Sequence, residues 1–162
     1  MNTRISSIID GRSGGTGDLL SRLIAFRSTV GSEREAQEYL AEYAKGLGIE
    51  ARLVPIQPDI ESDEDYTTVP GHKGYQGRAN LILAMPGAGG GRSIILNSHI
   101  DVVPGPDELF VPQMKDGVIK GRGAVDAKGQ CVVILWRRCL VCRQPVMSHA
   151  VEKRGQGPCL HY

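Results

Sequence analysis

The feature that most constrains the fold of this chain is an apolar run from Ile94 to Val103 that contains His99 and Asp101. Most residues of the run are aliphatic or β-branched, which is typical of a strand buried in a sheet. Successive side chains of a strand point to opposite faces, so His99 and Asp101 are expected on the same face. The sequence therefore predicts a buried strand over 93–102 that presents an imidazole and a carboxylate together.

This pair has the chemistry of a metal ligand and the group that orients it. A neutral imidazole nitrogen binds zinc, and an acidic group commonly holds the other ring N–H. A lone His-x-Asp pair is a weak signal, because a hydrogen-bonded, half-buried histidine is more common. A glycine-rich turn further along strengthens it, since Asp126 adds a hard, anionic ligand. Gly121 and Gly123 permit a sharp turn, and Gly129 permits close packing where a helix begins.

Three motifs therefore follow one another along the chain. Gly77–Leu81 opens a predicted strand, Ser98–Pro104 carries the histidine and aspartate, and Gly121–Gly129 carries the second aspartate. In their order and spacing, from about Asp18 to Gln130, they resemble the amino-terminal part of the dinuclear zinc amidohydrolases. This family includes acetylornithine deacetylase, succinyl-diaminopimelate desuccinylase, aminoacylase and carboxypeptidase G.

The resemblance implies an α/β fold, a truncated zinc-peptidase-like catalytic domain with a mixed sheet flanked by helices. It makes His99 a ligand of one zinc ion, Asp126 the carboxylate that bridges two zinc ions, and Asp101 the catalytic residue that orients His99. Cobalt and manganese are alternatives at such a nitrogen and oxygen ligand set. The implied reaction is the metal-assisted hydrolysis of an amide bond in an N-acyl amino acid or small peptide, most nearly as in acetylornithine deacetylase.

The chain also departs from the family pattern. The family's general base and a further ligand come from an adjacent pair of glutamates, and an acidic residue and a histidine follow later. No Glu-Glu pair is present, Glu152 is the only acidic residue after Asp126, and His149 and His161 lie in no family motif. Zinc sites need three or four protein ligands, and this chain offers two. We therefore expect a fragment, without the smaller domain that often mediates homodimer formation in the family.

Composition narrows the class of protein. With 162 residues, 41% hydrophobic and 23% charged, the chain suits one soluble globular domain. A formal net charge of +1 gives no electrostatic reason to expect nucleic acid or an anionic membrane as a partner. No signal peptide or membrane span is predicted, so the expected location is cytoplasmic and the expected partner is a small-molecule substrate.

Periodicity and turn signals predict an α/β order of elements. The acidic loop 57–77, which holds His72, lacks the spacing of a calcium loop and is expected to be solvated. The glycine-rich segment 86–91 lacks the lysine of a nucleotide loop and is expected to join neighbouring strands. The predicted helices cover 18–26, 32–47 with a Ser32–Glu35 capping box, and 127–135, and the predicted strands cover 49–56, 78–85, 93–102 and 118–120.

The end of the chain differs in composition. We divide the chain into residues 1–136, the amino-terminal part of the catalytic domain, and 137–162, an atypical Cys/Arg-rich tail that an out-of-frame segment would explain. A Cys139-x-x-Cys142 pair with Cys159-x-His161 is one candidate for a structural zinc site. Reduced thiols in an unstructured tail are the favoured alternative for these residues; Cys131, the fourth cysteine, lies in the predicted helix 127–135.

Three functions remain open on sequence alone. The chain is an amidohydrolase whose missing ligands come from another chain or a longer product, or it is an inactive fragment that binds metal weakly. The third alternative is a small interaction module that binds another protein through apolar faces left uncovered. The inactive fragment is the favoured state of the chain as written.

Overall fold

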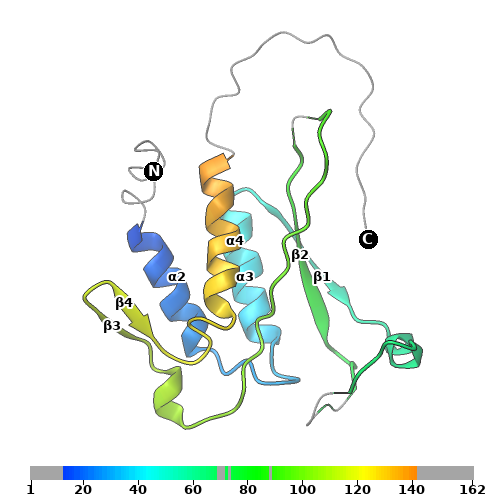
Figure 1. Cartoon of the computed structure of the whole chain (residues 1–162), viewed down its shortest axis with the longest axis horizontal. Coiled ribbons are helices and arrows are strands. Elements are labelled where there is room, and N and C mark those ends of the chain that lie inside the picture. Colours follow the sequence, from blue (N-terminus) through cyan, green and yellow to red (C-terminus); the bar gives the residue numbers. More distant parts are fainter. Residues whose placement is uncertain (1–12, 69–71, 73, 88, 142–162) are drawn as a thin grey trace.

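A computed structural model describes residues 13–68, 72, 74–87 and 89–141 (Figure 1). Three α-helices, four short strands and two 3-10 helices form in this part of the chain. In chain order they are α2 (Ser13–Ala25), α3 (Arg34–Gly46), β1 (Glu50–Pro55), η1 (Pro58–Ser62), β2 (Ala79–Ala84), η2 (Asp107–Phe110), β3 (Gln113–Lys115), β4 (Val118–Lys120) and α4 (Lys128–Val141).

The strands form two separate antiparallel pairs. In the first pair, β1 and β2 lie with Glu50 opposite Ala84 and Pro55 opposite Ala79. In the second, β3 and β4 form a hairpin whose turn residues Asp116 and Gly117 both have positive φ angles, 52° and 75°. Such a two-residue turn matches the twist of the flanking strands. The α/β class is confirmed, but the described residues form two small antiparallel sheets in place of one mixed sheet.

The strand predicted at 93–102 is wrong. This stretch has no sheet partner in the described part of the chain, and Ile94 and Ile95 are 80% and 77% exposed. Apolar residues favour a strand only where a neighbouring strand accepts their backbone hydrogen bonds, and sequence alone does not supply that neighbour. Because 93–102 forms no strand, the described residues of 86–91 do not join two neighbouring strands, contrary to the prediction. Alternation does hold further on, because Ile100 and Val102 are buried.

The three predicted helices are confirmed, but their predicted boundaries are not. Helices are present at all three predicted places, but α2 begins five residues before Asp18 and α4 continues past Leu135 to Val141. The Ser32–Glu35 capping box is wrong, because α3 begins after Glu33 and no side chain caps it. Residues 142–162, with the candidate Cys142 and Cys159-x-His161 zinc ligands, lie outside the described residues, as does His149.

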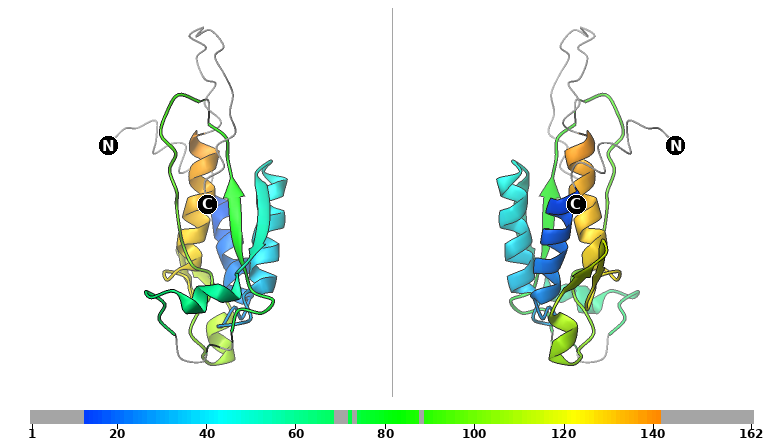
Figure 2. Two further views of the ribbon diagram at one scale, coloured as in Figure 1. Left: turned by 90° about the vertical axis from the view of Figure 1, so that its right-hand side faces the viewer. Right: turned by 90° about the vertical axis from the view of Figure 1, so that its left-hand side faces the viewer.

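The core lies between the helices and the larger sheet. In Figures 1 and 2, α2 and α4 run side by side, and α3 packs against the β1–β2 pair. The helices meet through apolar positions spaced three and four residues apart, the spacing of one helix face. Buried core residues are Leu19, Leu23, Ala36, Leu40, Ala44, Ile49, Ile100, Cys131, Val132 and Leu135.

One buried lysine joins the start of α4 to the end of α2. The Lys128 side chain is completely buried, and its Nζ donates a hydrogen bond of 2.6 Å to the Phe26 carbonyl oxygen. Burial disfavours the charged amine and lowers the pKa of Lys128 to about 8. The hydrogen bond satisfies a carbonyl group that the end of α2 leaves without a helical partner.

Gly121 is required where the β4 strand ends beside α2. A Cβ atom on Gly121 would lie 2.5 Å from Cγ2 of Ile24, which is completely buried. We expect Gly121→Ala to lower the free energy of unfolding by about 1–3 kcal/mol, because the core must shift to admit the methyl group. Urea unfolding followed by circular dichroism measures this change.

Gly15→Ala is the matched control, because Gly15 lies in α2 and a Cβ there would meet nothing within 4 Å. This variant should gain about 0.5–1 kcal/mol from the better helix propensity of alanine. Equal effects of the two variants would contradict the packing described around Gly121.

Lys128→Met should remove the bond to Phe26 and with it about 1–3 kcal/mol of stability, the cost of an unsatisfied buried carbonyl. The native state favours the neutral amine above pH 8, whereas the unfolded chain stays protonated up to its ordinary pKa of 10.5. Wild-type stability should therefore rise from about pH 8 to 10.5, relative to that of the variant. Unfolding at several pH values in EDTA measures this, and the exposed Lys45→Met is the control.

Candidate metal site

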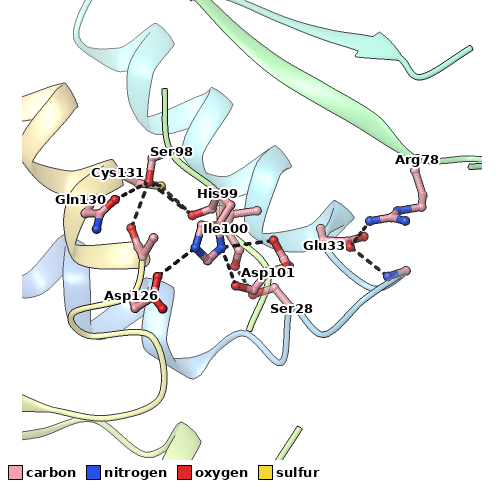
Figure 3. Close-up of polar contacts among 12 residues, drawn as sticks. Ser28, Glu33, Arg78, Ser98, His99, Ile100, Asp101, Asp126, Gln130 and Cys131 are labelled. Atoms are coloured by element: carbon pink, nitrogen blue, oxygen red, sulfur yellow. Dashed lines mark hydrogen bonds and ion pairs between the residues drawn. The ribbon is translucent and has the colours of Figure 1, made fainter. Parts of the chain in front are cut away.

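His99 lies between two carboxylates (Figure 3). Its Nε2 is 2.9 Å from Oδ1 of Asp126, and its Nδ1 is 3.1 Å from the carbonyl oxygen and 3.2 Å from Oδ1 of Asp101. The structure therefore brings together all three site residues singled out from the sequence. Asp126 faces Nε2 and Asp101 faces Nδ1, so an ion bound at Nε2 would lie next to Asp126 and not next to Asp101.

The electrostatics of this cluster favour a cation at His99. Partial burial lowers the pKa of His99, but the hydrogen bonds and negative charges of Asp126 and Asp101 outweigh it, and the pKa is raised above its ordinary value. With Nδ1–H donated to Asp101, the lone pair of Nε2 points toward Asp126. The position between Nε2 and Asp126 therefore suits a positive charge, either a proton or a metal ion.

The three side chains are open to solvent. The exposed fractions are 52% for His99, 41% for Asp101 and 80% for Asp126. Both groups that face each other across the 2.9 Å contact are thus accessible to a dissolved ion without rearrangement of the core. Because these side chains are exposed, other ligands or a substrate have space to lie beside them.

A tight turn at the start of α4 places Asp126. Ala124 N–H donates to the Gly121 carbonyl at 3.1 Å, and Lys128 N–H donates to the Gly123 carbonyl at 2.9 Å. A Cβ atom on Gly129 would lie 2.2 Å from the Ala124 carbonyl oxygen, so no side chain fits there. The close packing predicted for Gly129 is confirmed, and the positive φ of 80° at Gly123 agrees with the predicted sharp turn.

The segment that carries His99 is held through its backbone. Ser28, which is completely buried, donates its hydroxyl to the Ile100 carbonyl at 2.7 Å and accepts the Val102 N–H at its own carbonyl at 2.8 Å. From the other side, the Cys131 thiol donates to the His99 carbonyl at 3.4 Å. Sequence reasoning missed Ser28, which lies just beyond the helix predicted over 18–26.

Cys131 contacts the segment that carries His99. It lies one turn into α4, where burial raises the pKa of its thiol, and it contacts Ser98 Oγ at 3.6 Å. Ser98 in turn lies 3.3 Å from the Ala127 carbonyl oxygen. These contacts join the His99 segment directly to the first turn of α4. A single cysteine in an apolar helix gives no sequence signal for such a contact.

Within the described residues, no third potential ligand accompanies His99 and Asp126. Across 13–68, 72, 74–87 and 89–141, no three His, Cys, Asp or Glu side chains are grouped so that they could hold a metal ion. His72 lies elsewhere, with Nε2 3.2 Å from Glu61 and Nδ1 3.3 Å from Arg78, and its side chain is 7% exposed. Arg78 also pairs with Glu33 at 2.7 Å. His72 is thus part of a structural network.

The described residues also contain no helix that is both long and apolar enough to cross a membrane.

The comparisons with known proteins concern the same segment. The family model described as Peptidase family M20/M25/M40 matches residues 95–137, which include His99, Asp101 and Asp126. The LysW-lysine/LysW-ornithine hydrolase of Sulfurisphaera tokodaii is 50% identical over 118 residues, which are 73% of this chain and 25% of that protein. The succinyl-diaminopimelate desuccinylase of Leptothrix cholodnii is 33% identical over 142 residues, 83% of this chain and 32% of that protein.

A third relative is the "Probable carboxypeptidase" of Aspergillus terreus, 33% identical over 114 residues, 66% of this chain and 23% of that protein. This chain spans about a quarter to a third of the length of the curated relatives it matches. The family resemblance drawn from the three motifs is confirmed. The chain is therefore a member of peptidase family M20/M25/M40, a generally metal-dependent family of hydrolases, and covers part of the length of its relatives.

Proposed function

We propose that this chain carries half of the active site of a metal-dependent hydrolase that cleaves amide bonds in N-acyl amino acids or small peptides. The observation that carries the proposal is the 2.9 Å approach of His99 Nε2 to Asp126 Oδ1 on an open surface. Both residues lie inside the segment that matches the family, and the matched relatives include a desuccinylase and LysW-lysine/LysW-ornithine hydrolases.

The donor set fits a divalent metal, with zinc preferred and cobalt or manganese as alternatives. An imidazole nitrogen and a carboxylate oxygen are ordinary zinc ligands, and the carboxylate also suits harder ions. His99 would bind one ion through Nε2, and Asp126 would bridge two ions. When bound, the metal polarises the amide carbonyl and makes water a better nucleophile near neutral pH.

The chain's own residues bind and orient. Asp101 accepts the Nδ1–H of His99, which fixes the tautomer that leaves Nε2 free to bind an ion. Ser28 and Cys131 hold the backbone on either side of His99, so the ring keeps its position. The Gly121–Gly129 turn fixes the Asp126 carboxylate opposite the ring.

The same reasoning makes the 162-residue chain inactive on its own. The described residues supply no third ligand beside His99 and Asp126. Two ligands give weak metal binding, because structural and catalytic zinc sites use three or four. A non-catalytic fragment that keeps this metal-binding half is thus the expected state, and purified chain with added zinc should not hydrolyse N-acetyl amino acids.

Asp126→Ala and His99→Ala should each weaken zinc binding by at least about 10-fold, because each removes one of two ligands. Isothermal titration with zinc, supported by cobalt absorption spectra, measures the affinity. Asp59→Ala is the control, since Asp59 is an exposed carboxylate on η1. Zinc affinity that is the same in all four proteins would contradict the proposed ligands.

Asp101→Ala should lower zinc affinity by about 10-fold, near the lower end of such effects, because the Asp101 carbonyl still accepts the Nδ1–H. Unfolding of the metal-free protein should be unchanged within about 0.5 kcal/mol, since Asp101 is half-exposed. Nitrogen NMR of the His99 ring reports the tautomer directly. A loss of stability with no change in zinc affinity or tautomer would assign Asp101 a structural role instead.

A further inference from the structure

A buried histidine outside the metal site joins two separate parts of the chain. The His72 side chain is 7% exposed, and its Nε2 lies 3.2 Å from Oε1 of Glu61 on η1. Its Nδ1 lies 3.3 Å from Nη1 of Arg78, the residue immediately before β2. One imidazole ring therefore links η1 to the start of β2 through side-chain contacts, and the proposed metal site makes no use of it.

The two partners of this ring fix its protonation state. An arginine side chain can only donate hydrogen bonds, so Nδ1 of His72 accepts the one from Arg78 and carries no proton. The ring proton is then on Nε2, which donates to the Glu61 carboxylate. The bridge from Glu61 to Arg78 therefore exists only when the imidazole ring is neutral.

Arg78 is held from its other side by a carboxylate. Its Nη2 donates to Oε1 of Glu33 at 2.7 Å, and the two side chains are 20% and 9% exposed (Figure 3). The same oxygen accepts the N–H of Gly31 at 2.9 Å. Charge-assisted hydrogen bonds of this kind are stronger than those between neutral groups. We expect Arg78 to stay with Glu33 when its contact with His72 changes.

Two tyrosine rings complete the described surroundings of His72. The centroid of the Tyr75 ring lies 4.5 Å from that of His72, and the centroid of the Tyr66 ring lies 6.3 Å away. The guanidinium carbon of Arg78 lies over the Tyr75 ring, 5.2 Å from its centroid. Tyrosine side chains carry no charge near neutral pH. Among the described residues, the charged groups that face His72 are therefore Glu61 on one side and Arg78 on the other.

Protonation of His72 acts in opposite ways on these two contacts. In an imidazolium ring both nitrogens are donors, so Nδ1–H would face an N–H group of Arg78 and two positive charges would meet. The contact with Glu61 would become a charge-assisted hydrogen bond and would strengthen. Histidine is the side chain that ordinarily changes charge between about pH 5 and 8. Mild acid therefore favours one contact of the ring over the other.

We infer that His72 is a pH-sensitive switch, whose neutral ring bridges Glu61 to Arg78 and whose protonated ring stays with Glu61 and separates from Arg78. In the neutral state Arg78 is the one cation between the carboxylates of Glu33 and Glu61 in this network. The added proton supplies a second cation, so the network divides into two ion pairs, His72–Glu61 and Arg78–Glu33. The side-chain link between η1 and the start of β2 is then broken.

NMR spectra of the whole chain in EDTA, recorded at about pH 7.5 and about pH 5, test the switch. At the higher pH, the nitrogen shifts of His72 should be those of the Nε2–H tautomer, with nuclear Overhauser effects between its ring and the Arg78 side chain. At the lower pH, both ring nitrogens should be protonated and these effects should be lost. A proton on Nδ1 at the higher pH, a ring that stays neutral at the lower pH, or an unchanged Arg78 contact would overturn the inference.

Two histidine variants give a matched comparison. In His72→Gln the amide can accept from Arg78 and donate to Glu61 but does not titrate, so the Arg78 guanidinium shifts should lose their dependence on pH. His99→Gln makes the same change at the candidate metal site and should keep that dependence. Loss of the dependence in both variants, or its persistence in His72→Gln, would overturn the inference. The wild-type spectra decide the tautomer and the contact even if one variant does not fold.

Discussion

The site depends on three residues that follow α2. Phe26 accepts the buried Lys128 amine at its carbonyl, and Ser28 bonds to the backbone of Ile100 and Val102. Between them, Arg27 pairs with Asp107 of η2. One short connection therefore anchors both the segment that carries His99 and the turn that carries Asp126. Ser28 and Lys128 are buried, and buried polar groups are costly unless satisfied, so their bonds specify one arrangement of the chain.

The helices could be predicted because their information is local. Leu19 and Leu23 on α2, and Ala36, Leu40 and Ala44 on α3, repeat every three to four residues, and all are buried. The stretch 93–102 is also rich in apolar residues but forms no strand, since a strand depends on a neighbour distant in sequence. Ile94 and Ile95 are exposed for that reason, although their composition is that of a buried strand.

The site was predictable in part. His99, Asp101 and Asp126 were found from motif spacing, and the geometry brings all three together. Lys128, Ser28 and Cys131 were not assigned the roles they have, because each acts on a backbone carbonyl. Every residue has a backbone carbonyl, so a side chain that bonds to one does not require any particular residue type at the partner position. Such contacts therefore produce no recognisable motif in the sequence.

The shared anchor at residues 26–28 makes His99 and Asp126, the two proposed ligands, one cooperative unit. Local opening of a protein proceeds in contiguous groups of residues that lose protection together. If the connection after α2 opens, the bonds to Ile100, Val102 and Lys128 break in the same event, and His99 and Asp126 part. One opening event thus exposes the Val102 amide to solvent and frees the Lys128 side chain, so the candidate site is either whole or lost.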